Sequence, residues 1–131
     1  MDSFKSKKVS VNKRPEELFN ILSDLRNLDK ITPPSINMSN ITHSTCSLNI
    51  NNLTEVKLTI SEKKPFSYIS IQAENNQLPF LLQCYIEKEG DYKSQVELEI
   101  NIKLNMMTKM MVEKPLKELL NQLSNKLSIL K

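Results

Sequence analysis

QVELEINIKL, residues 95–104, alternates polar and apolar side chains along its whole length. Successive side chains of an extended strand point to opposite faces, so this pattern predicts a strand with one buried and one solvated face. Val96, Leu98, Ile100 and Ile102 belong to the buried set. The stretch therefore indicates a sheet that packs one face against a core.

A methionine-rich segment and a leucine-striped helix follow this strand. MMTKMM occupies residues 106–111, and leucines then recur at three- and four-residue spacing as far as Leu130. That spacing places the apolar side chains on one face of a helix. Pro115 lies inside the pattern and removes a backbone donor, so we expect it either to start the leucine segment or to bend a longer helix.

The rest of the chain repeats these two signals. Period-two alternation recurs between Thr42 and Ile86 with turn-forming residues between the runs, which predicts an antiparallel meander. Residues 4–12 indicate a first strand whose alternation breaks in the middle. Pro15 and two glutamates then predict the start of a short helix, and a second short helix is expected to end before Pro33-Pro34.

Composition favours one globular domain that spans residues 1–131. The net charge is +3, the apolar fraction is 39%, and there is no tryptophan. Because the chain lacks a basic stripe with stacking aromatics, we expect no nucleic-acid binding. It also shows no secretory signal and no run of ~20 apolar residues, so we expect a cytoplasmic protein without stable membrane insertion.

Three stretches resemble a known superfamily. They are VSVN (9–12) leading to PEELF (15–19), LSDL (22–25), and LNM (104–106) continuing through MMVEKPL (110–116). Together with the order of elements, they resemble the START-like superfamily of helix-grip proteins (SRPBCC), which includes the birch pollen allergen and polyketide cyclase-like families. The resemblance covers essentially the whole chain and is closest to short bacterial members without assigned activity.

This resemblance implies an α+β helix-grip fold. Its parts would be a curved seven-stranded antiparallel sheet wrapped around the long C-terminal helix, two short helices after the first strand, and a pocket between sheet and helix. Polyketide cyclase-like relatives use pocket acids, histidines and tyrosines for proton transfer. None of those residues can be matched to a position in this chain.

Candidate catalytic residues are isolated. His43 is the only histidine, and no second metal-type ligand recurs at useful spacing. Glu97 and Glu99 follow the exposed periodicity of their strand. Because a catalytic or metal-binding role needs partner groups, we predict no catalytic residue, no metal site and no cofactor. The sequence favours a binding protein over an enzyme.

The methionines are the best functional signal. Thioether side chains are unbranched and polarizable, so they adapt to varied apolar shapes. The leading hypothesis is non-catalytic binding of a small hydrophobic or lipid-like ligand between the sheet and the C-terminal helix, driven by apolar burial. The predicted ligand-binding residues are Met38, Leu82, Cys84, Leu98, Ile100, Met107, Met110 and Met111.

Two alternatives remain open. The chain has one glycine and one alanine, so its interior must be filled mainly by large side chains. With a filled core, the domain would be a protein-interaction module that docks a partner or forms a homodimer. The methionines would then fill the space between the helix and the sheet. A cyclase-like enzyme is the weaker alternative.

Overall fold

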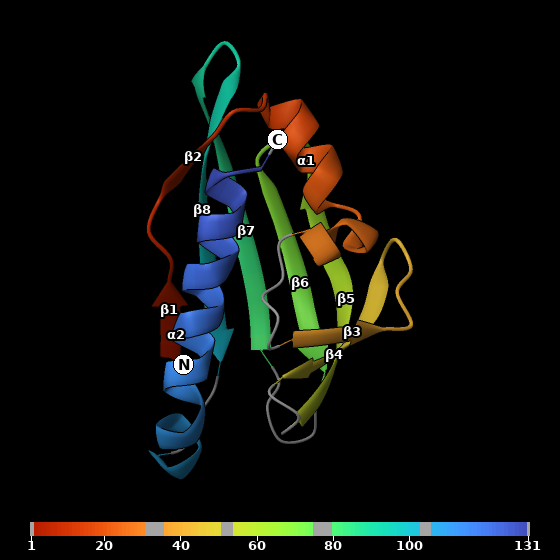
Figure 1. Ribbon diagram of the computed structural model, residues 1–131, viewed down its shortest axis with the longest axis vertical. Helices are drawn as coiled ribbons and strands as arrows, with labels where there is room; N and C mark the ends of the chain where they lie inside the picture. Colours follow the sequence, from red (N-terminus) through yellow and green to blue (C-terminus); the bar gives the residue numbers. More distant parts are fainter. Residues whose placement is uncertain (1, 31–35, 51–53, 75–79, 103–105, 131) are drawn as a thin grey trace.

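The computed structural model describes residues 2–30, 36–50, 54–74, 80–102 and 106–130. Figure 1 shows the chain as a long sheet with helices against one side. The elements are, in order, β1 (Asp2–Lys5), β2 (Val9–Val11), α1 (Pro15–Leu22), the 3-10 helix η1 (Leu25–Lys30), β3 (Ile36–Ser39), β4 (Thr45–Ile50), β5 (Thr54–Lys64), β6 (Tyr68–Glu74), β7 (Phe80–Gly90), β8 (Lys93–Ile102) and α2 (Met106–Ser128).

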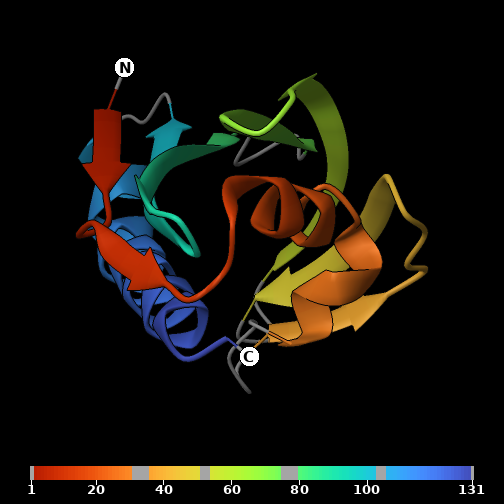
Figure 2. The ribbon, with the colours of Figure 1, turned by 90° about the horizontal axis from the view of Figure 1, so that it is seen from above.

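The strands form one antiparallel sheet. Its order is β1-β8-β7-β6-β5-β4-β3, and β2 also pairs with β8. Figure 2 shows the sheet curving around α1 and α2. Register shifts leave one extra residue at Ser61 in β5 and at Glu89 in β7, and such bulges increase the local twist of a sheet. The expected α+β fold with a curved sheet and a C-terminal helix is confirmed.

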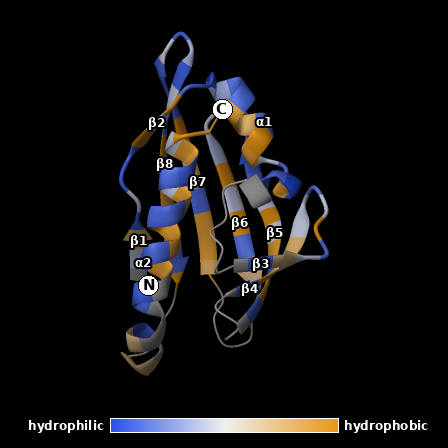
Figure 3. Ribbon diagram, in the orientation of Figure 1, coloured by the Kyte–Doolittle hydropathy of each residue, from blue (hydrophilic) through white to orange (hydrophobic). Residues whose placement is uncertain are grey.

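Alternation separates the two faces of the sheet as predicted. In β8, Val96, Leu98, Ile100 and Ile102 are buried, whereas the side chains between them are only partly so. The buried set faces the helices, and Figure 3 shows hydrophobic and hydrophilic residues alternating along the strands. The core therefore lies between this inner face and the two α-helices.

The first strand differs from its prediction. Residues 4–12 do not form one strand, because β1 and β2 are separate, and within the described residues the sheet has eight strands instead of the expected seven. Lys5 of β1 lies opposite Glu99 of β8, and Val9 of β2 lies opposite Val96 of β8. The four residue steps from Lys5 to Val9 therefore match only three steps along β8. One extra residue is thus inserted. It keeps both Phe4 and Val9 on the buried face, although an odd number of positions separates them.

Ser6 fills the break between these two strands. Its N–H donates to the Leu98 carbonyl over 2.8 Å, and its Oγ accepts from the Leu98 N–H over 2.9 Å. Both backbone groups of Leu98 are therefore satisfied where the regular ladder stops. The broken alternation in the sequence marks this irregularity.

The helices also refine the sequence-based picture. The second short helix is η1, a 3-10 helix, and both short helices follow β2. Helix α2 runs for 23 residues through Pro115, so the proline does not start it. Leu116, Leu120 and Leu127 are among its fully buried side chains. In the described part of the chain, no helix combines the length and apolarity needed to cross a membrane.

Candidate functional site

The two α-helices and the sheet meet around a small apolar cavity, which we call the seam cavity. Helix α1 contacts β6, β7 and β8, whereas α2 contacts β1, β2 and β8. The volume of the seam cavity is about 30 Å³. Its lining comprises Leu22 from α1, Ile69 and Ile71 from β6, Leu82 and Cys84 from β7, Leu98 from β8, and Leu123 and Leu127 from α2.

Local sequence explains how these side chains converge. Leu82 and Cys84 are two residues apart on β7, so both point to the inner face. Leu123 and Leu127 are four residues apart on α2, so they share one helix face. The two-residue repeat of the strand and the 3.6-residue repeat of the helix therefore place apolar side chains at the same cavity.

The chemistry of the seam cavity is almost wholly aliphatic. Cys84 is the one titratable side chain among the lining residues, and burial raises its pKa to about 12. The thiol is therefore protonated near neutral pH and is a poor nucleophile. An apolar cavity of this size offers water no hydrogen-bond partners and stays dry. The lining can bury apolar groups, but it has no proton to exchange near pH 7.

The structure brings together part of the predicted ligand-binding set. Leu82, Cys84 and Leu98 line the seam cavity. Ile100 is fully buried on the same face of β8, two residues from Leu98. Met38 on β3 is partly buried and packs against the core cluster. Ligand contact by any of these residues stays a prediction.

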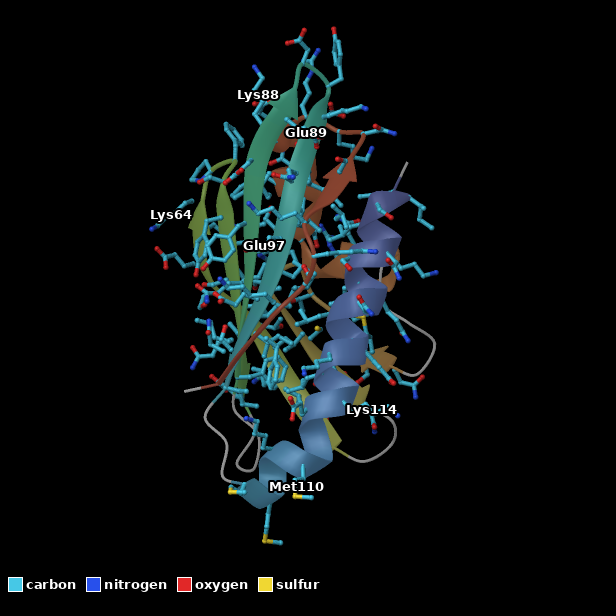
Figure 4. All side chains as sticks on the ribbon, turned by 90° about the vertical axis from the view of Figure 1, so that its left-hand side faces the viewer. Lys64, Lys88, Glu89, Glu97, Met110 and Lys114 are labelled. Atoms are coloured by element: carbon cyan, nitrogen blue, oxygen red, sulfur yellow. The ribbon has the colours of Figure 1, made fainter. Side chains whose placement is uncertain are left out.

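Three methionines of α2, Met106, Met107 and Met110, are not at this seam. Met107 is 78% exposed and Met110 is 81% exposed, as is Met106. The first turn of α2 extends past the ends of β1 and β8, so none of the described strands covers it, and Met110 points away from the sheet (Figures 1 and 4). The expectation that the thioethers of Met107 and Met110 face the enclosed space is wrong. The side chain of Met111 lies outside the described residues.

Sequence reasoning missed five lining residues, although a signal for them existed. Each lies on an apolar face that periodicity identifies, because each recurs at the spacing of its helix or strand. The methionines were predicted to line the site because their side chains are chemically unusual, whereas the described lining consists mainly of ordinary aliphatic side chains. The five are Leu22, Ile69, Ile71, Leu123 and Leu127.

The outer face of the sheet carries a polar network. Tyr68 and Tyr85 donate to Gln83 Oε1 over 2.7 and 3.0 Å, and Gln83 Nε2 donates to Glu99 Oε1 over 3.2 Å. Desolvation, followed by the charge of Glu99, raises the pKa of Tyr85. Ser3 also donates to Glu99. These groups satisfy one another, so the network stabilises the surface of the sheet.

Other candidate reactive groups are dispersed. His43 is exposed, and its carbonyl accepts a hydrogen bond from the Leu25 N–H over 2.8 Å. Within the described ranges, no three His, Cys, Asp or Glu side chains lie close enough to hold a metal ion.

Comparisons with known proteins support the fold. No protein-family model matches the sequence, and no curated protein is similar to it. Among solved structures, a START superfamily protein from Mycobacterium smegmatis superposes with a TM-score of 0.67 at 16% identity, covering 98% of this chain and 99% of that one. A protein from Thermus thermophilus gives a TM-score of 0.69 at 12% identity, covering 97% and 94%.

A third neighbour, a protein from Arthrobacter aurescens, gives a TM-score of 0.73 at 10% identity. The alignment covers 96% of this chain and 83% of that one. Sequence identities this low show a shared fold and carry no statement about activity. The START-like fold expected from the sequence is confirmed.

Proposed function

We propose, from this START-like fold and its aliphatic seam, that the protein binds a small hydrophobic or lipid-like molecule between the sheet and α2 without catalysis. The observation that carries the proposal is the seam cavity, where both α-helices and three strands present apolar side chains to one point. Affinity would come from removing apolar surface from water, at about 25 cal/mol per Å².

Ligand binding at this site requires the cavity to grow. Pockets for small molecules usually measure about 300–1,000 Å³, whereas the seam cavity measures about 30 Å³. Leu123 and Leu127 belong to α2, which contacts β1, β2 and β8 at one end of the sheet. We therefore propose that these two leucines form the wall that moves when a ligand enters.

Native mass spectrometry and the uptake of a fluorescent fatty-acid probe test this proposal. Leu82 and Leu81 provide a matched pair, because they are neighbours on β7 and point to opposite faces. Leu82→Phe places a larger ring in the seam cavity and should weaken probe uptake about tenfold. Leu81→Phe should leave uptake unchanged.

A wild-type protein that carries no bound mass and takes up no probe contradicts the proposal. Equal loss of uptake in both phenylalanine variants would also contradict it, because the effect would then not depend on the seam. The small size of the cavity favours one alternative, a protein-interaction module with a filled core. That alternative predicts no uptake and a concentration-dependent change in sedimentation.

A further inference from the structure

We infer that the protein docks on the surface of an anionic phospholipid bilayer, using the exposed start of α2 and the groove beside it. Two surfaces define the site. The methionine tip consists of Met106, Met107 and Met110. The lysine groove lies between β1 and α2 and contains Lys5, Lys7, Lys109 and Lys117. Lys5, Lys7 and Lys117 are exposed and Lys109 is half-buried, and the inference does not require a ligand in the seam cavity.

The methionine tip is unusual for a surface. Its three side chains are 81%, 78% and 81% exposed, and all lie within five consecutive residues of one helix. Figure 4 shows Met110 at the projecting end of α2, away from the sheet. A protruding group of flexible apolar side chains can insert into the apolar boundary of a lipid layer.

The lysine groove supplies the complementary charge. It has a volume of about 470 Å³, and among its described lining residues Glu113 is the one acidic side chain beside four lysines. Lys117 Nζ lies 3.0 Å from Glu113 and Lys5 Nζ lies 3.8 Å from Glu99, so part of the positive charge is balanced. Along the chain, residues 101–112 contain two lysines and no acidic residue.

The two surfaces are continuous. A second hollow of about 390 Å³ is lined by Met110, Lys114 and Glu118, and it shares Glu113, Lys117 and Asn121 with the lysine groove. Peripheral proteins bind membranes stably when apolar insertion is combined with lysines that attract anionic headgroups. Methionine tip and lysine groove provide both parts side by side.

Other binding partners do not match both the methionine tip and the lysine groove. A nucleic acid would contact the lysines and leave the thioethers in water, and Phe4, the aromatic residue in the groove, is buried at 7% exposure. A second copy docked through the same patch would bring together two surfaces that each carry an excess of lysines, and their like charges repel. A bilayer with anionic headgroups satisfies both the charge and the exposed apolar surface.

Sedimentation with vesicles tests the inference. Full-length protein should bind vesicles that contain phosphatidylglycerol and should not bind vesicles of phosphatidylcholine alone. Lys7 and Lys8 are a matched pair, because both are exposed neighbours but Lys7 lines the lysine groove and Lys8 lines a hollow on the outer face of the sheet. Lys7→Glu should weaken binding roughly tenfold or more, and Lys8→Glu should change it by less than about twofold.

A second comparison tests the thioethers. Replacing Met106, Met107 and Met110 together by serine should weaken vesicle binding about tenfold, whereas leucine at all three positions should retain it, because leucine keeps the apolar surface. All three positions are exposed, so the variants should keep the melting temperature of the wild type, and this is measured for each of them.

Three results would overturn the inference. The first is equal binding to the two kinds of vesicle. The second is an equal effect of Lys7→Glu and Lys8→Glu. The third is no vesicle binding together with self-association that the serine variant abolishes, since the tip would then be a contact between protein chains. Vesicle binding without probe uptake would support the docking surface and count against the ligand proposal, so the two fail separately.

Discussion

The ring of Phe66 stands edge-on against the ring of Phe19, with centroids 5.7 Å apart and an interplanar angle of 87°. Phe66 lies in the turn between β5 and β6, and its backbone φ is +70°. A side chain in this left-handed region is strained by roughly 1–2 kcal/mol. The contact with α1 offsets that strain, because an aromatic pair contributes about 0.5–1.5 kcal/mol beyond its buried area.

Two substitutions at Phe66 separate these effects. Phe66→Ala loses the ring and keeps the strain, whereas Phe66→Gly loses the ring and relieves the strain. We expect the glycine variant to be about 1 kcal/mol more stable than the alanine variant in urea unfolding. If the two variants have the same midpoint and slope, the turn is not strained.

The second prediction concerns Ser6. Ser6→Ala removes the acceptor for the buried Leu98 N–H, so we expect a loss of about 1–3 kcal/mol in the free energy of unfolding. Ser10→Ala is the control, because that exposed hydroxyl donates to Glu89 on the surface. It should change stability by less than about 0.5 kcal/mol. A Ser6 effect as small as the control would show that the hydroxyl is dispensable.

The third prediction concerns alkaline pH and Cys84. Because burial raises its pKa from 9.0 in a free thiol to about 12, the native protein keeps a proton that the unfolded chain releases. The contribution of the protonated Cys84 thiol to the free energy of unfolding is fully present below pH 9, and it is lost as pH rises toward 12. Cys84→Ala should therefore flatten the decline in urea midpoint between pH 8 and 10, and an unchanged slope would argue against a buried thiol.

The fourth prediction concerns acid pH and Asp24. Hydrogen bonds from the Arg26 side chain, the shortest of 2.6 Å, lower the pKa of Asp24 from 3.8 to about 2 against an opposing effect of desolvation. The stabilisation of the folded state by the ionised Asp24 carboxylate is present above pH 4, and it is lost as pH falls toward 2. Asp24→Asn should reduce the acid sensitivity of the melting temperature in this range. Asp91→Asn, at an exposed turn, is the control.

Periodicity predicted most of the strands and the long C-terminal helix, whereas the helix-grip arrangement was implied by the family resemblance. The alternation of residues 95–104 placed Val96, Leu98, Ile100 and Ile102 on the buried face of β8, and leucine spacing identified the buried face of α2. Both patterns depend only on local geometry, so they can be read without knowing the rest of the fold. The same reasoning found Leu82, Cys84 and Leu98 at the candidate site.

The methionines show where such reasoning fails. Helical spacing says which side chains share a face, but it does not say whether a neighbouring element reaches that far. The first turn of α2 extends beyond the strands, which depends on the relative lengths and positions of α2, β1 and β8. For the same reason, the extra residue between β1 and β2 was visible only as broken alternation until the register with β8 was known.

Pairing of both β1 and β2 with β8 has a consequence for synthesis of the chain on the ribosome. Among the described strands, β1 and β2 pair only with β8, so residues 2–11 must wait for this pairing while about 90 further residues are translated. At about 5–20 residues per second this delay is on the order of 5–20 s. During that time β8 cannot cover Phe4, Val9 and Val11, so apolar side chains that the fold buries stay exposed on the nascent chain.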